Sequence, residues 1–486
     1  MKGAPISHVV IVGSGVDAWL TALALARAVG PLGVAIKVLQ TPTNPTPVVL
    51  DALPALRALH RLLGVDEQAL VTQCGAVPVV GQRFTGWNLD QPPFVRAYAS
   101  VGDGGSHLEF IQHWLRARTL GMTASFGDFS PAGVAAAKRR GPPIQGEWNG
   151  ADYGYHLDGA AYVELLQRKA LAAGVTLRAV QSLTVHRREG GVEHLDIADS
   201  CVSADLYIDA TGEDARLALA GSWEDWSACF PFPKLGYFTA SRTDQLEALT
   251  ENVAFPSGWA AVLDLAATRV IAAVLEDQIS GDTAKMELEA VLGGSLSHSG
   301  AYTAARPGMR DGWVGNCVSL GRSAIRTDVL EGGWLLGLQI GLSHLIANFP
   351  LCQDMAGEAR LFNSAVRRHA EAVRDYQTAN YRLSNRSEPK WRQAARAPVP
   401  SSLQARLDLF ALRGALPPFE DEVFQADDWR MMLLGHGLIP TDANPAGKSL
   451  DDAVERQRLL GIIQRNVEEA AGLPSVEAWR SSRGAA

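Results

Sequence analysis

Cysteine and long apolar runs are both scarce in this sequence, and each shortage restricts what the chain can be. The 486 residues include only five cysteines, and no two of them have CxxC spacing. So sparse a set argues against a disulfide framework and against a metal site of the zinc type, and it suits the reducing cytoplasm. No stretch of about 18 apolar residues is free of charge or glycine, so we expect no membrane span.

Positive charge is also in short supply. Lysine and arginine together number 44 against 52 acidic residues, which gives a net charge of −8. Such a chain has no electrostatic reason to bind nucleic acid or an anionic membrane. The short basic cluster Lys138-Arg139-Arg140 is interpreted as solvated surface. The length exceeds that of a usual single core, so more than one structural region is expected.

The N-terminal segment has the pattern of a dinucleotide-binding strand–turn–helix unit. Residues 8–12 are mostly β-branched, as in a buried parallel strand, and an Ala/Leu-rich helix is predicted to reach about Val29. Between them a GxGxxA turn allows backbone to approach a pyrophosphate at the helix N-terminus, and its third small residue need only pack helix on strand. The predicted cofactor-binding residues of this turn are Gly13, Ser14, Gly15, Val16, Asp17, Ala18 and Trp19.

A second strand is predicted over residues 35–39, and it ends at Gln40. In dinucleotide-binding folds an acidic residue at this place accepts a hydrogen bond from the ribose hydroxyl. The amide oxygen of glutamine can still accept, so the substitution weakens this contact without abolishing it.

Two further strand–glycine elements lie far along the chain. Residues 204–212 form a strand containing Asp209 and ending in a turn at Gly212, after a predicted β-ribbon of residues 177–185 and 192–197. Another strand ends at Gly321, next to Arg322, with a helix predicted over residues 335–348. Elements spread in this way predict an FAD-binding sheet, since a NAD-only Rossmann domain would complete its site within the first half.

Several motifs resemble those of the flavin-dependent tryptophan halogenases, from about residue 8 to residue 440. The first is Trp19, which directly follows the third small residue of the GxGxxA turn. Further matching motifs occur along the chain as far as the predicted C-terminal helices. They include Trp19, Phe84-Thr85-Gly86-Trp87, Tyr155-His156-Leu157-Asp158, Asn316-Cys317-Val318-Ser319-Leu320-Gly321, Leu330-Glu331 and Gly435-His436-Gly437-Leu438-Ile439-Pro440.

The resemblance implies an α/β FAD-binding fold of the flavin hydroxylase/halogenase type, with a parallel sheet, a β-ribbon and a substrate sheet. It implies an FAD module over residues 1–350, interleaved with substrate segments near 75–150 and 220–310, and a mostly helical region over residues 351–486. It also implies FAD reduced by a separate flavin reductase, an aromatic substrate, and the homodimer common in the family. Active members use oxygen and halide to make hypohalous acid, which a lysine directs while a glutamate assists.

The catalytic lysine of that family is missing here. Counting without gaps from Gly64 to Trp87 places Val79 at its position, and residues 38–137 contain no lysine. An ammonium group would hold the halogenating species by hydrogen bonding, whereas an isopropyl group has no donor. Arg83 lies four residues further on and could lie on the same face of a strand, but we favour the interpretation that it does not replace the lysine.

The substrate and halide segments also depart from the family. The WxWxIP stretch keeps only its first tryptophan, Trp259, which with Trp429 is a candidate for the substrate pocket. The family's Ser-Thr-Gly halide turn is replaced by Gly332-Gly333, whose N–H groups could still face an anion. Arg322 could pair with an FAD phosphate or crowd it.

Acid–base candidates remain. Glu331 is either a helix N-terminal carboxylate stabilised by the dipole or a retained proton acceptor. His107 and His156 are interpreted as structural residues. The chain after about Trp479 is expected to lack structure.

Three functions remain open from the sequence. The favoured one is an FAD-dependent oxidoreductase of the tryptophan halogenase type that is not a standard halogenase. The alternatives are a catalytically inactive flavin- or ligand-binding protein, and a true halogenase that uses different residues.

Overall fold

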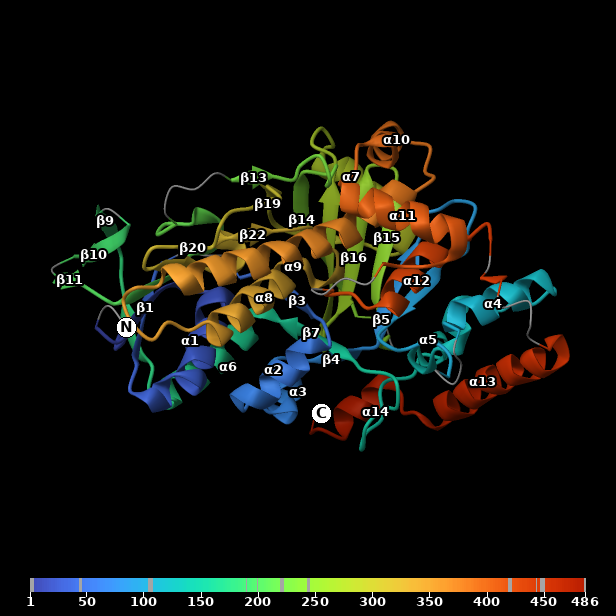
Figure 1. The fold of residues 1–486 in the computed structure, drawn as a ribbon, viewed down its shortest axis with the longest axis horizontal. Coiled ribbons are helices and arrows are strands. Elements are labelled where there is room, and N and C mark those ends of the chain that lie inside the picture. Colours follow the sequence, from blue (N-terminus) through green and yellow to red (C-terminus); the bar gives the residue numbers. More distant parts are fainter. Residues whose placement is uncertain are drawn as a thin grey trace. The chain divides into compact units, whose positions relative to one another are not determined.

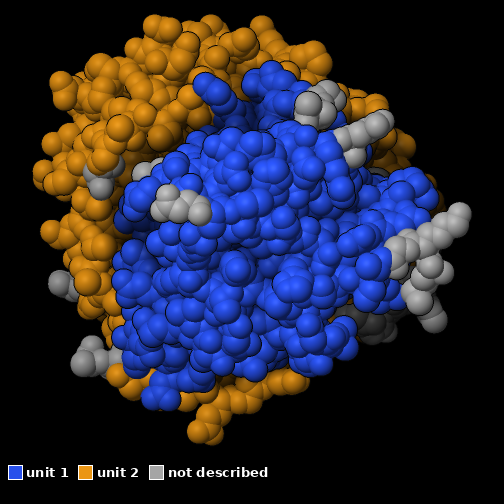
Figure 2. All heavy atoms as spheres, turned by 90° about the vertical axis from the view of Figure 1, so that its left-hand side faces the viewer, with its two compact units in different colours: residues 1–74, 157–227, 306–372 blue, residues 75–156, 228–305, 373–486 orange. Residues whose placement is uncertain are grey.

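The computed structural model is drawn as a ribbon in Figure 1. The structure describes residues 4–42, 46–103, 108–188, 190–198, 200–218, 223–242, 245–417, 422–442, 444–445 and 451–484. The chain forms two compact units, shown in separate colours in Figure 2. Unit 1 consists of residues 1–74, 157–227 and 306–372, and unit 2 of residues 75–156, 228–305 and 373–486. The domain division at residue 350 stays a prediction.

Unit 1 contains a six-stranded sheet, and all its neighbouring strands are parallel except at one edge. In spatial order the strands are β20 (Trp313–Val314), β21 (Cys317–Ser319), β12 (Leu206–Ala210), β1 (His8–Gly13), β2 (Ala35–Gln40) and β8 (Thr176–Ala179). The strands predicted near residues 8, 35, 205 and 317 are confirmed. They come from distant segments, as the FAD-binding fold requires.

Helices pack beside this sheet because its central strands are apolar on both faces. The helices in contact are α1 (Val16–Ala28), α6 (Gly159–Ala172) and α8 (Gly333–Ala347), and α1 packs against the other two. Nearly all of α1 is buried. The helices predicted to reach about Val29 and to span residues 335–348 are therefore confirmed within two residues at each end.

A separate antiparallel ribbon extends from unit 1 at the left of Figure 1. Its strands are β9 (Thr184–Arg188), β10 (Gly191–Ile197) and β11 (Ser200–Val202). The prediction that residues 177–185 form one arm of the ribbon is wrong in part. Leu177–Ala179 instead pair with β2 in the main sheet, since Val38 lies opposite Leu177.

Smaller elements complete unit 1. They are α2 (Ala55–Leu63), α3 (Glu67–Gln73), β3 (Val49–Ala52), and a three-stranded sheet of β13 (Glu224–Asp225), β19 (Gly308–Met309) and β22 (Ile325–Arg326).

Unit 2 is built on a seven-stranded sheet that is antiparallel except between β15 and β5. Its order is β18 (Ser297–Ala304), β14 (Lys234–Ser241), β17 (Thr268–Leu275), β16 (Gly258–Asp264), β15 (Thr250–Phe255), β5 (Gly81–Thr85) and β6 (Phe94–Ala97). Helix α7 (Gly281–Leu292) buries Ala284 and Leu288 in a core with Phe238 and Ile271 of the sheet.

Other elements of unit 2 before residue 300 are β4 (Val77–Val79), α4 (Phe110–Thr119), the 3-10 helix Phe126–Phe129 and α5 (Pro131–Ala137). The first three residues of β7 (Gly154–Asp158) also belong to unit 2 and pair with β4.

The C-terminal region is mostly helical, as predicted. Its helices are α9 (Ala356–Leu383), α10 (Pro389–Arg396), α11 (Ser401–Arg413), α12 (Ala426–Gly435), α13 (Asp452–Gly472) and α14 (Val476–Ser481). The expectation that the chain lacks structure after Trp479 is wrong for residues 480–484. Trp479 is fully buried, and the Arg480 Nε donates to the Ala76 carbonyl oxygen at 3.0 Å. Among the described helices, none combines the length and the apolar character that crossing a bilayer requires.

Candidate flavin site

The glycine turn joins β1 to α1 at the carboxyl end of the sheet. Gly13 has φ +149°, and a Cβ atom there would lie 2.2 Å from the Ala210 carbonyl oxygen of β12. Only glycine lets the two strand ends approach so closely. The next glycine, Gly15, is the N-cap of α1 and has no side chain to cap the helix. The first N–H groups of α1 and its positive dipole end therefore suit an anion such as a pyrophosphate.

The interior of this turn holds a buried ion pair. Asp17, in the first turn of α1, is fully buried, and its Oδ2 lies 3.5 Å from the Arg322 Nε. Burial raises the pKa of Asp17, while the Arg322 charge acts in the opposite direction. The Arg322 guanidinium also lies 4.9 Å from the ring centroid of Trp334. The arginine whose role the sequence left open thus contacts an aspartate and a tryptophan of its own chain.

The strand next to β1 ends in a hydrogen-bonded turn organised by Asp209. Its Oδ1 accepts from the Thr211 N–H at 3.0 Å and from the Thr211 hydroxyl at 2.6 Å. Its Oδ2 accepts from the N–H groups of Leu217 and Ala218 at 2.7 and 2.8 Å. Burial raises the pKa of Asp209, and these hydrogen bonds oppose the shift. Asp209 therefore holds the backbone around Gly212 in place.

The remaining residues of the predicted cofactor set have simpler surroundings. Gln40 ends β2 and is half-buried, and its carbonyl oxygen accepts from the Val180 N–H at 2.9 Å. Ser14 is half-buried, whereas Val16, Ala18 and Trp19 are buried within unit 1.

The residues around this turn fit an FAD pyrophosphate. Among the described residues, a Cβ added at Gly15 would meet only the Thr46 Oγ1, at 3.2 Å, so one movable hydroxyl crowds the start of α1. The Asp17 carboxylate would oppose a phosphate by itself, but the Arg322 charge beside it compensates. Whether the predicted residues contact the cofactor stays a prediction.

The turn before α8 holds Glu331 in a strained conformation. Glu331 has φ +57° and ψ +44°, in the left-handed region, and it is 1% exposed. Such strain in a residue other than glycine costs about 1–3 kcal/mol and is concentrated at functional sites. A Cβ atom would lie 2.6 Å from the Asp51 carbonyl oxygen at Gly332 and 1.7 Å from the Asp328 carbonyl oxygen at Gly333. Backbone packing therefore excludes the hydroxyl side chains of a Ser-Thr turn at both positions.

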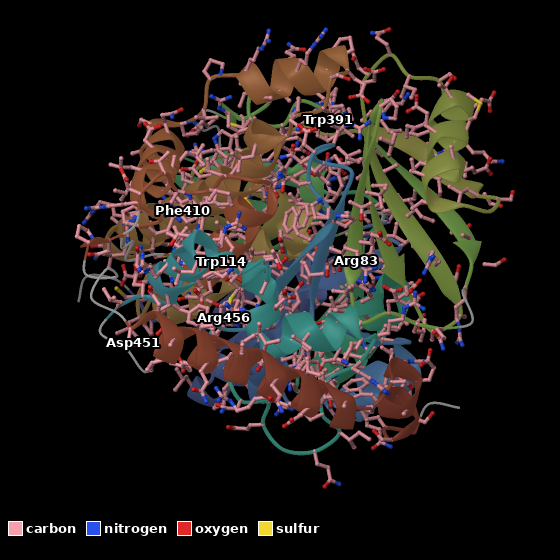
Figure 3. The ribbon with its side chains drawn as sticks, turned by 90° about the vertical axis from the view of Figure 1, so that its right-hand side faces the viewer. Arg83, Trp114, Trp391, Phe410, Asp451 and Arg456 are labelled. Atoms are coloured by element: carbon pink, nitrogen blue, oxygen red, sulfur yellow. The ribbon has the colours of Figure 1, made fainter. Side chains whose placement is uncertain are left out.

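Val79 lies at the end of β4, where it pairs with Gly154 of β7. Its side chain is fully buried. Arg83 (Figure 3) belongs to β5, the next strand along the chain but part of a different sheet, and its Nη1 lies 2.7 Å from the Glu247 Oε2. The Arg139 Nε lies 3.3 Å from the other oxygen of the same carboxylate. Arg83 is thus engaged in a partly exposed ionic cluster within unit 2.

The two tryptophans predicted for the substrate pocket are both buried in unit 2. The Trp259 Nε1 donates to the Tyr381 hydroxyl at 2.7 Å, and its ring centroid lies 5.4 Å from that of Trp87. The Trp429 Nε1 donates to the Glu422 Oε1 at 3.2 Å. Both indole rings have their N–H groups bonded within the protein, and their contact with a substrate stays a prediction.

The histidines flagged from the sequence divide between the described and undescribed residues. The His156 ring nitrogens lie 2.8 Å from the Thr250 Oγ1 and 3.1 Å from the Asp264 carbonyl oxygen, which is consistent with a structural role. His107 lies outside the described residues. Sequence reasoning missed the pairing of Asp17 with Arg322, for which the only signal was a carboxylate in the first turn of a mostly apolar helix.

Comparison with known proteins identifies the family. Residues 8–452 match the family model described as tryptophan halogenase. The chain is 23% identical to the 7-chloro-L-tryptophan 6-halogenase KtzR of Kutzneria sp. (strain 744), over 96% of this chain and 97% of that protein. It is 24% identical to the tryptophan 7-halogenase KtzQ of the same organism, over 98% of each.

Two solved structures extend the comparison to the fold. BrvH, a flavin-dependent halogenase from Brevundimonas sp. BAL3, superimposes with a TM-score of 0.92 at 25% identity, covering 98% of this chain and 99% of that one. Xcc4156, a flavin-dependent halogenase from Xanthomonas campestris, gives a TM-score of 0.92 at 26% identity and covers 98% of both chains. The chain therefore belongs to the tryptophan halogenase family and is an oxidoreductase of the flavin-dependent halogenase type.

Proposed function

We propose that this chain uses reduced FAD and oxygen to modify an aromatic small molecule, without the lysine-directed halogenation of its family. Family membership supports the flavin chemistry. The uncapped start of α1 beside the glycine turn is the observation that carries the cofactor part of the proposal. The buried isopropyl group of Val79 supports the part that concerns halogenation.

FAD, once bound and reduced, supplies the electrons with which oxygen is activated. A separate flavin reductase is its expected source, as in the family generally. The residues that would hold the cofactor lie in the glycine turn and at neighbouring strand ends, with Asp209 acting through the backbone of its turn. They are Gly13, Ser14, Gly15, Val16, Asp17, Ala18, Trp19, Gln40, Asp209, Gly212, Gly321 and Arg322.

The halogenation step would lack its cation. An isopropyl side chain donates no hydrogen bond, so Val79 can neither hold nor polarise a hypohalous acid. Arg83 is a poor substitute because its guanidinium already pairs with Glu247 at 2.7 Å. Removing it from that carboxylate would leave Glu247 with the more exposed Arg139 as its remaining partner.

Glu331 is the proposed proton acceptor. It lies just before the N-terminus of α8, and a carboxylate is the base needed when an aromatic ring loses a proton on substitution. The left-handed backbone of Glu331 supports a functional role, since strain of this kind is concentrated at functional sites. Trp259 and Trp429 are the proposed aromatic surfaces for a planar substrate.

One observation favours a second function, ligand binding without catalysis. Asp17 places a carboxylate in the first turn of α1, where a phosphate would approach, and the neighbouring Arg322 is already paired with it. A protein that only binds a flavin or a related ligand could accept a weaker site. Oxygen uptake with reductase, NADH and FAD separates the two: stimulation by an aromatic compound supports catalysis, whereas FAD binding without uptake supports the second function.

Titration with FAD tests the cofactor site directly. Gly15→Ala adds one methyl group at the N-cap of α1, where φ is −90° and the backbone conformation does not require glycine. Gly30→Ala is the matched control, because a Cβ at Gly30 meets nothing within 4 Å. We expect the first variant to weaken FAD binding by at least about tenfold, or 1.4 kcal/mol, and the control to bind as the unmodified protein does.

Two results would contradict the assignment of the cofactor. One is unmodified protein that binds neither oxidised nor reduced FAD. The other is binding that is equally tight in both glycine variants, since the flavin would then lie elsewhere. Circular dichroism of each variant establishes that the fold is retained.

The proposal extends to the surroundings of the protein. The five free thiols support a reducing compartment such as the cytoplasm, and the acidic net charge gives no reason to invoke nucleic acid or membrane as partners. A homodimer, as the family implies, would give twice the chain mass of 52.0 kDa in light scattering.

A further inference from the structure

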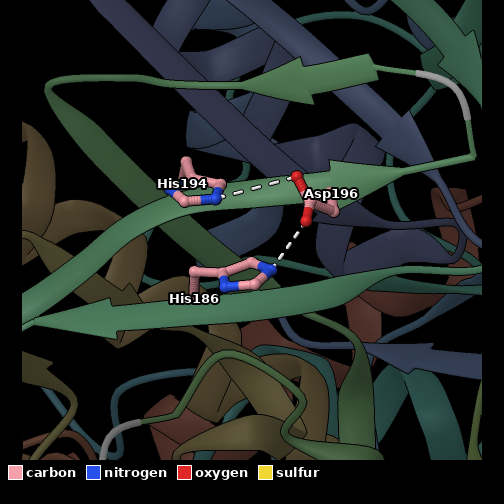
Figure 4. Close-up of side chains that lie close together, drawn as sticks. All are labelled: His186, His194 and Asp196. Atoms are coloured by element: carbon pink, nitrogen blue, oxygen red, sulfur yellow. Dashed lines mark ion pairs between the residues drawn. The ribbon is translucent and has the colours of Figure 1, made fainter.

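Three side chains that can ligate a metal ion meet on the ribbon of unit 1. The His186 Nε2 lies 2.7 Å from one carboxylate oxygen of Asp196, and the His194 Nε2 lies 3.7 Å from the other (Figure 4). One ligand atom from each residue can be chosen so that all three lie within 4.8 Å of one another. The cluster is therefore compact enough for all three residues to reach one ion.

Strand register brings these residues together. His186 of β9 lies directly opposite His194 of β10, and Asp196 follows His194 by two residues on the same face. The register of the two strands shifts between Val192 and His194, and this irregularity changes which side chains of β10 point to each face of the ribbon. As a result Val192 and Leu195 are buried, whereas the two histidines and Asp196 lie on the opposite, solvent-facing side.

The arrangement of the rings favours a shared ligand. The imidazole rings of His186 and His194 are stacked, with centroids 4.3 Å apart and planes inclined by 11°. Both rings therefore present their Nε2 atoms toward the same carboxylate (Figure 4). Surface ion pairs of this exposure contribute only about 0–1 kcal/mol by themselves. One ion bound by all three side chains would stabilise the same arrangement through direct coordination.

We propose that His186, His194 and Asp196 bind one divalent transition-metal ion. Two imidazole nitrogens and one carboxylate oxygen form a ligand set suited to Zn²⁺, Ni²⁺ or Cu²⁺, whereas Mg²⁺ and Ca²⁺ prefer oxygen ligands alone. Three protein ligands leave one tetrahedral position for water. The site uses no cysteine, so it is independent of the cysteine spacing of the chain.

The bound ion would link the two strands of the ribbon. His186 comes from β9 and the other two ligands from β10, so coordination joins the strands across their exposed face. The opposite face already packs into the core of unit 1 through Val192, Leu195 and Ile197. An ion on the outer face would reduce opening of the ribbon, adding to the backbone ladder, the contact between His186 and Asp196 and the stacked imidazole rings.

Zinc titration of the untagged 486-residue chain, stripped with a chelator and dialysed, tests the site. Competition with a chromophoric chelator gives affinity and stoichiometry, and Co²⁺ in place of Zn²⁺ reports coordination through its visible absorption. We expect one ion per chain, with binding weakened by at least about tenfold, or 1.4 kcal/mol, in both His186→Gln and Asp196→Asn. His8→Gln is the matched control, because His8 is an exposed histidine of the same unit, with 66% of its side chain accessible.

Hydrogen exchange supplies a second readout that does not depend on flavin chemistry. Zinc should slow exchange in β9 and β10 of the unmodified protein and of His8→Gln, but not in the two ligand variants. Equal zinc affinity in all four proteins, absence of binding, or protection confined to other segments would overturn the proposal. FAD titration should be the same in all four, so failure here is distinct from failure of the flavin site.

Discussion

The pair formed by Asp17 and Arg322 makes a quantitative prediction about the glycine turn. Arg322→Met removes the cation 3.5 Å from a carboxylate that is fully buried, while keeping an unbranched apolar side chain against Trp334. Breaking a buried ion pair by removing one partner costs about 3–5 kcal/mol, because the remaining charge is left without compensation. We therefore expect the free energy of unfolding to fall by about 3–5 kcal/mol at neutral pH.

The loss of unfolding free energy in Arg322→Met should increase as pH rises. Burial already raises the pKa of Asp17, and removing the Arg322 charge raises that pKa further. A carboxyl group with a raised pKa in the folded state is neutral in both states at low pH, so there it costs little. As pH rises from the ordinary aspartate pKa through the raised value, the unfolded state ionises first and stability falls, by at most about 1.4 kcal/mol per pH unit.

Urea unfolding at pH 5 and pH 8 measures this effect in Arg322→Met, Asp17→Asn and the double variant. The double variant removes the titrating carboxyl group, so it corrects for the pH dependence of all other groups. We expect it to be more stable than Arg322→Met at pH 8 and to differ less from it at pH 5. Equal stability of Arg322→Met and unmodified protein at pH 8, or a double variant no more stable than the single one, would refute the reasoning.

Two other sites give predictions with matched controls. Gly333→Ser should destabilise the fold by at least about 1–3 kcal/mol through overpacking, since its Cβ would lie 1.7 Å from the Asp328 carbonyl oxygen. The control Gly357→Ser should change the melting temperature little, because a Cβ at that position meets nothing within 4 Å. Equal thermal stability of these two variants would show that the backbone of the turn before α8 can move to accommodate a side chain, which contradicts the packing argument. Asp209→Ala removes the acceptor of the Thr211 N–H, the Thr211 hydroxyl and the Leu217 N–H, at about 1–3 kcal/mol for each group that water cannot reach. The exposed Asp214→Ala should stay within about 0.5 kcal/mol of the unmodified protein in chemical denaturation, and a similar small loss in both variants would contradict the role given to Asp209.

Local patterns in the sequence predicted the flavin-binding framework well. The β-branched run before Gly13 and the apolar helix after it depend on residues close in sequence, and both elements lie where they were expected. The distant strands β12 and β21 were also predicted, because each is a short apolar run that ends in a glycine turn. In the parallel sheet of an FAD-binding fold these strands are expected to pair in parallel, and β12 does pair in parallel with both β1 and β21.

Contacts between distant residues could not be predicted in the same way. No local pattern places Arg322 against Asp17, since the pairing arises only when Gly321 packs at the start of α1. The histidine cluster depends on an irregularity in strand pairing at Val192, and period-two alternation alone does not reveal it. The chain after about Trp479 is expected to lack structure because chain ends are generally poorly ordered, yet Arg480 is buried and its Nε donates to the Ala76 carbonyl oxygen.

The central claim is that the flavin scaffold is kept while the cation that directs halogenation is replaced by Val79. Mass spectrometry of indoles and phenols incubated with bromide, FAD, NADH and a flavin reductase tests it, once FAD binding has been established. Bromide is the more permissive choice because it is oxidised more easily than chloride. We predict FAD-dependent oxygen uptake with no brominated product from the unmodified protein. A brominated product that requires the protein, and that persists in a Val79→Leu variant but disappears in Arg83→Gln, would contradict the claim and identify another cation as the halogenating group.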